Sequence, residues 1–272
     1  MALSNNATRV LVAICAIPVV IGASYFGGIY FLLFTLIIST FAFYEFSIFV
    51  KNKGANVNLW FGILSIVLLL INQFRFFISF LSIILLIVFV LSFIELFRNK
   101  DSAIINLGAT LLGIFYIGLF AVALLGIREF YKDDLYNRGG YIIIAVLATI
   151  WICDSAAYYG GSALGKHKLF KRVSPQKSWE GAILGFIFAL TSMVLAKIII
   201  LNFLSWNTVI ALGFIVGIFG QIGDLIESLI KRDAGVKDSS SIIPGHGGIF
   251  DRFDSLLYTA PLIFLYLSFF ER

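Results

Sequence analysis

Long apolar runs recur along the whole chain and alternate with short polar segments. A helix of about 20 apolar residues is long enough to cross a hydrocarbon core of roughly 30 Å. One apolar stretch, residues 10–50, is too long for a single span and divides at the Gly27-Gly28 pair, where we expect a tight hairpin. The pattern predicts nine transmembrane helices, at about 10–27, 28–50, 59–74, 76–97, 103–127, 141–160, 180–204, 206–229 and 250–270.

Composition agrees with this pattern. Hydrophobic residues make up 60% of the chain and charged residues only 13%, whereas soluble domains have roughly 25% charged residues. We therefore expect an all-α polytopic integral membrane protein with no sizeable soluble domain. Arg9 precedes an apolar region as in a signal peptide, but no small-x-small cleavage site ends that region, so we expect it to be retained.

Lys and Arg residues predict the orientation, because they accumulate in cytoplasmic loops. With the N-terminus inside, fourteen of them flank the cytosolic ends of the spans and five flank the outer ends. This favours an odd number of crossings and an external C-terminus. The net charge of +5 is spread over these loops, which suits an anionic lipid surface and argues against a nucleic-acid partner. Cys15 and Cys153 lie inside apolar spans, and we interpret both as small core residues.

The segment from Gly223 to Asp254 is the exception to the apolar pattern, because charged residues crowd between two helix-length apolar runs. Charge at membrane depth is unfavourable by roughly 2.5–3.5 kcal/mol per residue, so it indicates function. Two helix faces carry polar residues at offsets of three, four and seven. The first face holds Asp224, Glu227, Ser228 and Lys231, and the second holds Asp251, Asp254, Ser255 and Tyr258.

A glycine-rich loop, residues 239–248, joins these two faces, and its glycines allow backbone amides to approach an anion. Mg²⁺ prefers oxygen ligands and usually takes one or two carboxylates together with phosphate oxygens. The segment therefore predicts a magnesium–nucleotide site, where the basic residues offset phosphate charge. For these basic residues, capping of helix ends at the membrane interface remains an equal alternative; they are Lys231, Arg232, Lys237 and Arg252.

A second glycine-rich segment, Gly160 to Lys166, begins like a phosphate-binding P-loop. It continues with His167 in place of Ser or Thr, and it follows a membrane helix and not a strand, so we reject that interpretation. The surrounding residues, 166–177, are expected to form a short basic stretch on the cytosolic interface, with an ordinary positive-inside loop as the alternative.

These motifs resemble the signature of the phosphatidate cytidylyltransferase family, also called CDP-diacylglycerol synthases. The resemblance covers roughly residues 150–261, and Ser178 stands where Thr is more usual. Its parts are Ser228-Leu-Ile-Lys-Arg232, Lys237-Asp238, Pro244-Gly-His-Gly-Gly248, Asp251-Arg-Phe-Asp254, Asp154-Ser-Ala-Ala-Tyr158 and Ser174-Pro-Gln-Lys177-Ser-Trp-Glu-Gly181.

The resemblance implies Mg²⁺-dependent transfer of a cytidylyl group from CTP to phosphatidic acid, giving CDP-diacylglycerol and pyrophosphate. It implies metal ligation by Asp224 and Asp251, with a second cation also conceivable, and a hydrogen bond from Ser228 to a phosphate or a ligand water. Lys231 is assigned to phosphate contact as well. The remaining residues assigned to substrate binding are Arg232, Lys237, His246, Gly247, Gly248, Arg252, Lys177, Asp154 and Asp254.

On this interpretation residues 141–272 form the catalytic region, with a polar funnel open to the cytosol. Residues 1–140 are lipid-facing helices, from which no functional residue is assigned. We expect the bacterial inner (cytoplasmic) membrane, with membrane lipids as further partners, and the resemblance suggests a homodimer. His246 has two open roles, as an acid or base and as a residue that shapes the loop or binds phosphate.

Three alternatives were weighed. A secondary transporter would explain Glu45, Glu95 and Lys197 within spans, although both glutamates lie close enough to span ends to reach the interface. A CDP-alcohol phosphotransferase is disfavoured because its aspartate signature is missing. A related synthase acting on an ether-lipid phosphate would have a similar site, and that choice stays open, as does CTP against dCTP.

Overall fold

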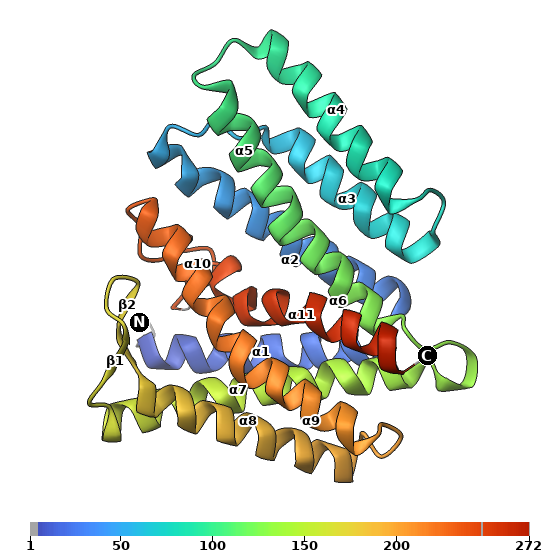
Figure 1. The fold of residues 1–272 in the computed structure, drawn as a ribbon, viewed down its shortest axis with the longest axis vertical. Helices are drawn as coiled ribbons and strands as arrows, with labels where there is room; N and C mark the ends of the chain where they lie inside the picture. The colour runs from blue at the N-terminus through green and yellow to red at the C-terminus, as the bar shows by residue number, and fades with distance from the viewer. Residues whose placement is uncertain (1–4, 246, 272) are drawn as a thin grey trace. The chain divides into compact units, whose positions relative to one another are not determined.

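The structure, a computed structural model, describes residues 5–245 and 247–271, and it is built mostly of helices (Figure 1). The long helices follow the apolar runs, because a helix satisfies its own backbone polar groups where no water is present. The helices are α1 Asn5–Phe26, α2 Gly28–Phe49, α3 Leu59–Arg75, α4 Phe80–Arg98, α5 Ala103–Gly113, α6 Phe120–Arg128, α7 Asn137–Leu164, α8 Trp179–Ile199, α9 Trp206–Phe214, α10 Gln221–Asp233 and α11 Phe250–Phe270.

Shorter elements complete the chain. Two π-helical segments join α5 to α6 and α9 to α10, so that each pair forms one continuous rod; they are η2 Ile114–Leu119 and η4 Ile215–Gly220. Two 3₁₀ turns are η1 Val50–Lys53 and η3 Asp133–Leu135. Two short strands are β1 Lys168–Phe170 and β2 Ser174–Ser178.

Every apolar segment that the sequence predicted as a span contains a helix, which confirms a mostly helical membrane protein. Within the part of the chain that the structure describes, seven helices are long and apolar enough to cross a bilayer. Two further apolar helices are shorter, at Val10–Phe26 and Leu59–Arg75. The predicted number of nine crossings and the polar funnel therefore stay predictions.

The chain divides into two compact units that interleave in the sequence. Among the described residues, unit 1 contains 5–23, 28–126, 233–245 and 247–253, and unit 2 contains 24–27, 127–232 and 254–271. Each unit thus draws residues from both sides of position 140. Helix α11 begins in unit 1 and continues in unit 2 from Asp254 onward.

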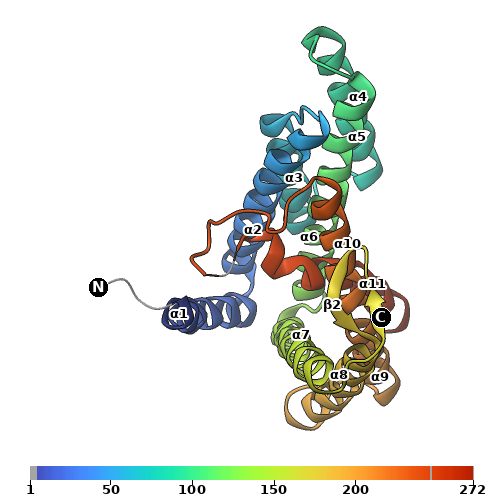
Figure 2. The same cartoon turned by 90° about the vertical axis from the view of Figure 1, so that its left-hand side faces the viewer.

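Unit 1 is organised around α2, on which α3 and α5 pack, and α4 in turn packs on α3 and α5 (Figures 1 and 2). Aromatic side chains of α2 fill its core, because Phe31, Phe43 and Phe46 are almost fully buried. Gly62 and Gly113 allow this packing, since a Cβ atom at either position would lie within 2.6 Å of the Phe43 ring. Helix α2 therefore sits at the centre of unit 1.

Unit 2 is organised around α8, which packs between α7 and α9 (Figure 1). Glycines bring α7 and α8 close together, as is typical of membrane helices. A Cβ atom on Gly181 would lie 2.6 Å from the Ala157 carbonyl oxygen, and one on Gly165 would lie 2.7 Å from Ser178 Oγ. The glycines that resemble a P-loop thus belong to a helix end and its contact with α8, in agreement with the sequence interpretation.

An antiparallel hairpin of β1 and β2 precedes α8 and was not predicted (Figure 2). The pairing joins Lys168 to Ser178 and Phe170 to Ser174. Ser178 then caps α8 by accepting a hydrogen bond from the Gly181 N–H at 3.2 Å. The basic stretch expected at residues 166–177 is therefore folded as a hairpin, and it delivers Lys177 from a strand.

Arg128, one of the five basic residues expected at the outer ends of the spans, has a fully buried side chain. In unit 2 the guanidinium Nη2 donates to the Tyr25 carbonyl at 2.9 Å and stacks on Tyr136, with 4.2 Å from Cζ to the ring centre. Arg128 thereby satisfies a carbonyl in the last turn of α1, a role typical of basic residues at helix ends.

Candidate active site

Asp224 is held at the start of α10 by a wide π-helical turn, η4. Such turns leave backbone carbonyls without their usual partners and are frequent at functional sites. The side-chain amide of Gln221 compensates, because its Nε2 donates to Gly217 O at 2.6 Å and to Ala182 O at 3.1 Å. The turn and its amide thus fix α10 against α8 just before Asp224.

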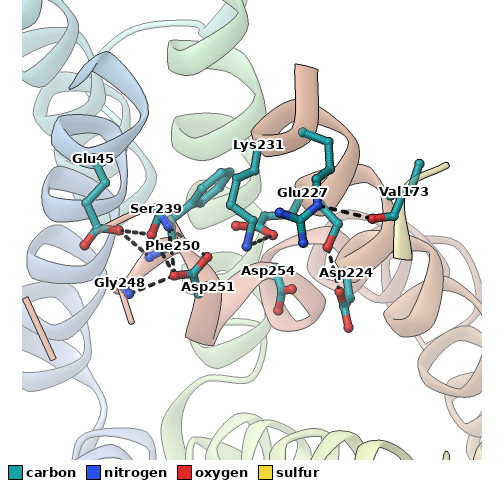
Figure 3. A network of polar contacts seen from close by, with 12 residues as sticks. Glu45, Val173, Asp224, Glu227, Lys231, Ser239, Gly248, Phe250, Asp251 and Asp254 are labelled. Atoms are coloured by element: carbon teal, nitrogen blue, oxygen red, sulfur yellow. Dashed lines mark hydrogen bonds and ion pairs between the residues drawn. The ribbon is translucent and has the colours of Figure 1, made fainter. Parts of the chain in front are cut away.

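The contacts of Asp224 lie within unit 2. Lys177 Nζ of strand β2 is 2.6 Å from Asp224 Oδ2, and Ser228 Oγ donates to Asp224 Oδ1 at 3.3 Å (Figure 3 labels Asp224). The Lys177 and Asp224 side chains are 29% and 35% exposed. A carboxylate with this exposure can still exchange its partner for a ligand, which a fully buried ion pair cannot do readily.

Two further aspartates add negative charge to this group. Asp254 of α11 lies close enough to Asp224, Asp154 and Lys177 to interact with each of them through charge. Helix α11 is held against α10 here, because Ser255 Oγ donates to Gly220 O at 3.0 Å and a Cβ atom on Gly223 would lie 2.6 Å from Tyr258. We name these side chains the acidic cluster: Asp154, Lys177, Asp224, Ser228 and Asp254.

The acidic cluster suits a hard divalent cation by its chemistry, since carboxylate oxygens are the ligands that Mg²⁺ prefers. Among the described residues, no three His, Cys, Asp or Glu side chains are grouped as a complete metal site. Mg²⁺ in nucleotide sites usually takes only one or two carboxylates and completes its shell with phosphate oxygens and water. The cluster therefore fits a metal that binds together with a phosphate substrate.

The distal turns of α10 carry two further cations, Lys231 and Arg232. Lys231 Nζ forms an ion pair with Glu227 Oε2 at 2.7 Å, and both side chains are buried (Figure 3). Arg232 is exposed and its Nε donates to Val173 O, in the hairpin, at 3.4 Å. Lys231 and Arg232, both expected from the sequence to contact phosphate, therefore have different surroundings.

The glycine-rich loop lies in unit 1. Gly247 has a φ angle of +81°, which disfavours a side chain, and its carbonyl accepts a hydrogen bond from the Ile243 N–H at 2.9 Å. Lys237 and Arg252 are exposed, whereas Gly248 is buried. His246 lies outside the described residues.

Asp251 ties this loop to the first turn of α11 (Figure 3). Its Oδ2 accepts hydrogen bonds from the Gly248 N–H at 2.8 Å, the Ser239 N–H at 3.0 Å and Ser239 Oγ at 3.0 Å. The bond to Gly248 reaches back three residues, as in a helix capping box. Asp251 therefore orders the loop, in addition to the ligand role that the family resemblance implies.

Glu45 is the residue of this region that the sequence analysis missed. It was interpreted as a residue able to reach the interface, yet it is fully buried in unit 1. Its carboxylate accepts four hydrogen bonds from the loop and the start of α11 (Figure 3 labels Ser239 and Phe250 among the partners). The donors are Ser239 Oγ at 2.9 Å, Ser240 Oγ at 2.6 Å, Ile249 N at 2.9 Å and Phe250 N at 2.8 Å. The available signal was an ionisable residue within an apolar run.

The structure thus gathers the predicted residues into two groups. In unit 2 it brings together Lys177, Asp154, Asp224, Ser228 and Asp254. In unit 1 it brings Asp251 to Gly247 and Gly248. The sequence predicts a single site in the charged segment, whereas the structure shows these two groups of contacts.

Comparison with known proteins gives consistent matches over almost the whole chain. The family model described as "Cytidylyltransferase family" matches residues 7–270. A phosphatidate cytidylyltransferase of Staphylococcus haemolyticus is 34% identical over 263 residues, covering 94% of this chain and 96% of the relative. One of Brucella melitensis is 33% identical over 276 residues, covering 99% and 96%, and one of Staphylococcus aureus (strain COL) is 33% identical over 261 residues, covering 94% and 96%.

Proposed function

The chain belongs to the cytidylyltransferase family, and from that premise we propose that it transfers the cytidylyl group of CTP to phosphatidate, giving CDP-diacylglycerol and pyrophosphate. The protein is a nucleotidyltransferase and a mostly helical membrane protein. The observation that carries the proposal is the acidic cluster, where Lys177 pairs with Asp224 at 2.6 Å beside Asp254 and Asp154.

In the proposed reaction, an oxygen of the lipid phosphate attacks the α-phosphorus of CTP, and the bond from that phosphorus to the pyrophosphate oxygen breaks. Because a phosphate is already ionised at neutral pH, the step needs little help from a protein base. Positioning and charge neutralisation then supply most of the rate. The side chains proposed to contact phosphate are Lys177, Ser228, Lys231, Arg232, Lys237 and Arg252, with the amides of Gly247 and Gly248.

We propose further that the reaction depends on Mg²⁺, with Asp224 and Asp251 as the carboxylates that hold it. Bound Mg²⁺ would neutralise phosphate charge and orient the triphosphate. For Asp224, the support is its partly exposed carboxylate, which a metal ion can reach. For Asp251, the support is its place in the family-like motif, since its Oδ2 also serves the loop. Lys177 forms an ion pair with Asp224 in this structure. We propose that its ammonium group moves to a phosphate when the substrates bind.

Topology also belongs to the proposal. We propose an N-terminus in the cytosol, an external C-terminus and a site that faces the cytosol of a bacterial inner membrane, on the strength of the Lys and Arg distribution. Such a site would meet CTP from the cytosol and phosphatidate from the membrane. The homodimer and the cytosol-open funnel remain proposals that rest on the resemblance alone.

The test is product identification by mass spectrometry with purified protein in detergent, CTP and phosphatidate. We expect CDP-diacylglycerol with Mg²⁺ and none with EDTA. Parallel reactions with an isoprenoid ether-lipid phosphate and with dCTP decide between the related substrates. Product from the ether lipid alone would replace phosphatidate as the substrate, and no product from any lipid in folded protein would contradict the proposal and favour the transporter alternative.

A further inference from the structure

The glycine-rich loop is ordered by a carboxylate that comes from a distant part of the chain. Glu45 of α2 accepts hydrogen bonds from residues 194 to 205 positions further along. A buried charge without partners would be strongly unfavourable, and four donors offset that cost. The first two amides of the α11 region, Ile249 and Phe250, are among those donors, so Glu45 also caps α11.

The four bonds divide evenly between the two carboxylate oxygens. Oε1 accepts from Ser240 Oγ and from the Ile249 N–H, and Oε2 accepts from Ser239 Oγ and from the Phe250 N–H. Each oxygen therefore serves one hydroxyl and one backbone amide. A hydroxyl can turn to accept a hydrogen bond, but a backbone N–H can only donate. Whichever way a glutamine amide turned here, one backbone N–H would face an NH₂ group and lose its acceptor.

The end of α2 and the turn η1 that follows it contact the chain on both sides of the loop. On the N-terminal side, at the end of α10, Asn52 Nδ2 donates to Ala234 O at 3.1 Å, and Lys53 Nζ lies 3.1 Å from Asp233 Oδ1. At its end, Phe49 stacks on the fully buried Phe250 with ring centres 6.3 Å apart. The segment from Phe49 to Lys53 therefore contacts both the end of α10 and the start of α11.

Ser239 links Glu45 to Asp251. Its hydroxyl lies 2.9 Å from Glu45 Oε2 and 3.0 Å from Asp251 Oδ2. One hydroxyl carries one proton, so it donates to one carboxylate at a time, and a change at Glu45 alters the hydrogen bonding of Asp251. Only glycine fits at position 248 beside this link, because a Cβ atom there would lie 1.9 Å from Ser239 Oγ and 2.5 Å from Glu45 Oε2.

We propose that Glu45 is a positioning residue for the transfer reaction, acting through Ser239 on Asp251 and through Ile249 and Phe250 on the start of α11. The inference rests on the proposed function, because Asp251 and Gly248 belong to the motif assigned there to the substrates. It gives an N-terminal helix a part in catalysis that the family-like motif, which begins near residue 150, does not include.

The experiment compares full-length Glu45→Gln, Glu45→Asp and Ser239→Ala with wild type in detergent. Glu95→Gln is the matched control, because Glu95 is also a buried glutamate of unit 1 but contacts Asn106 and Arg98. We measure kcat and KM for both substrates and, without substrates, hydrogen exchange of amides 236–250. A displacement of about 1 Å in a catalytic group costs on the order of 10²-fold in rate.

We expect kcat of Glu45→Gln to fall about 100-fold, with KM for phosphatidate within about twofold. Glu45→Asp keeps both oxygens and should recover part of the rate, and Ser239→Ala, which leaves the three other donors in place, should lie between. Exchange at either Ile249 or Phe250 should be at least about tenfold faster in Glu45→Gln, because one of these two amides loses its acceptor. Glu95→Gln should change neither kcat nor exchange in the loop.

Three results would overturn the inference: unchanged loop exchange in Glu45→Gln, faster exchange with wild-type kcat, or an equal loss of kcat in Glu95→Gln. If Glu45→Gln does not fold, Ser239→Ala decides by the same two readouts. Wild-type protein without cytidylyl transfer would instead overturn the proposed function. The exchange data, which need no substrate, keep the two failures distinct.

Discussion

The acidic cluster of unit 2 and the Glu45–Asp251 network of unit 1 use the same side-chain chemistry in opposite ways. Around Glu45, a fully buried carboxylate is surrounded by hydroxyl and amide donors. Around Asp224, a partly exposed carboxylate has one lysine and one weak serine contact and lies near two other acids. A buried carboxylate whose hydrogen bonds are all made stabilises one conformation of the protein. Carboxylates that lie close together repel one another, so their charged forms are stable only when a cation or a cationic group joins them.

The largest effect is expected from Asp224→Asn, because it removes the central charge of the acidic cluster. We expect activity to fall by about 10³-fold or more, a magnitude typical of the loss of a key electrostatic group. The control is Asp233→Asn, the same change at the other end of α10, where the carboxylate forms an exposed ion pair with Lys53. Steady-state assays should find the control within about twofold of wild type. Equal losses in both variants would contradict the distinction.

Gly248→Ala tests the network from the side of the loop. A methyl group at this position has no room beside Ser239 and Glu45, so the loop must shift. We expect activity to fall by about 10²-fold. Gly108→Ala is the control, since a Cβ atom there meets no atom within 4 Å and alanine favours a helix. Full activity of Gly248→Ala would show that the loop conformation does not matter.

Asp254→Asn should separate activity from stability. Asparagine removes the cost of burying a carboxylate at this position beside Asp224 and Asp154, and its side-chain oxygen can still accept the Ser255 N–H. We expect the thermal midpoint to rise by a few degrees, roughly 1 kcal/mol, while activity falls by about tenfold or more. Differential scanning fluorimetry and the transfer assay measure the two quantities. A lower midpoint would argue for a purely structural carboxylate.

Lys177→Gln should mainly weaken binding of CTP. Loss of one charge-assisted contact to phosphate corresponds to roughly 1.5 kcal/mol, or about a tenfold higher KM. Lys171→Gln, an exposed lysine in the turn of the same hairpin, should leave KM within about twofold of wild type. If both variants raise KM equally, the hairpin attracts the nucleotide by general charge and not through the Lys177–Asp224 pair.

The smallest effect is expected from Lys197→Gln, far along α8 from the cap at Ser178. Lys197 Nζ donates to Asn202 O at 2.7 Å and lies 5.7 Å from the centre of the Trp206 ring, so it already has local partners at a helix end. We expect less than about 1 kcal/mol of destabilisation and unchanged transfer activity. A large loss of function here would revive the transporter alternative, in which intramembrane charges form a pathway.

The sequence was sufficient for the helices because each apolar run carries its own length and ends. It was not sufficient for the hairpin, since β1 and β2 together hold only eight residues with no alternating pattern. Nor could it identify Glu45 as a buried anchor, because all four donors lie about 200 residues away and only the fold brings them together. The partners of Arg128 could not be predicted for the same reason, since Tyr25 O is 103 positions away.

The candidate site divides along a similar line. The aspartates and basic residues of α10 and α11 could be predicted, because their spacing places them on helix faces. The pairing of Lys177 with Asp224 spans 47 residues and depends on the hairpin, so no local pattern contains it. Sequence spacing also assigned Lys231 and Arg232 to one class, whereas burial separates the Lys231–Glu227 pair from the exposed Arg232.

The most direct test of the central claim follows the phosphorus atoms of CTP. Purified protein receives phosphatidate, Mg²⁺ and CTP labelled either at the α- or at the γ-phosphate, and lipid and aqueous phases are counted for wild type and Asp224→Asn. The account predicts α-label in the lipid phase and γ-label in aqueous pyrophosphate for wild type, and neither product for Asp224→Asn. Entry of γ-label into lipid, or undiminished transfer by Asp224→Asn, would contradict it.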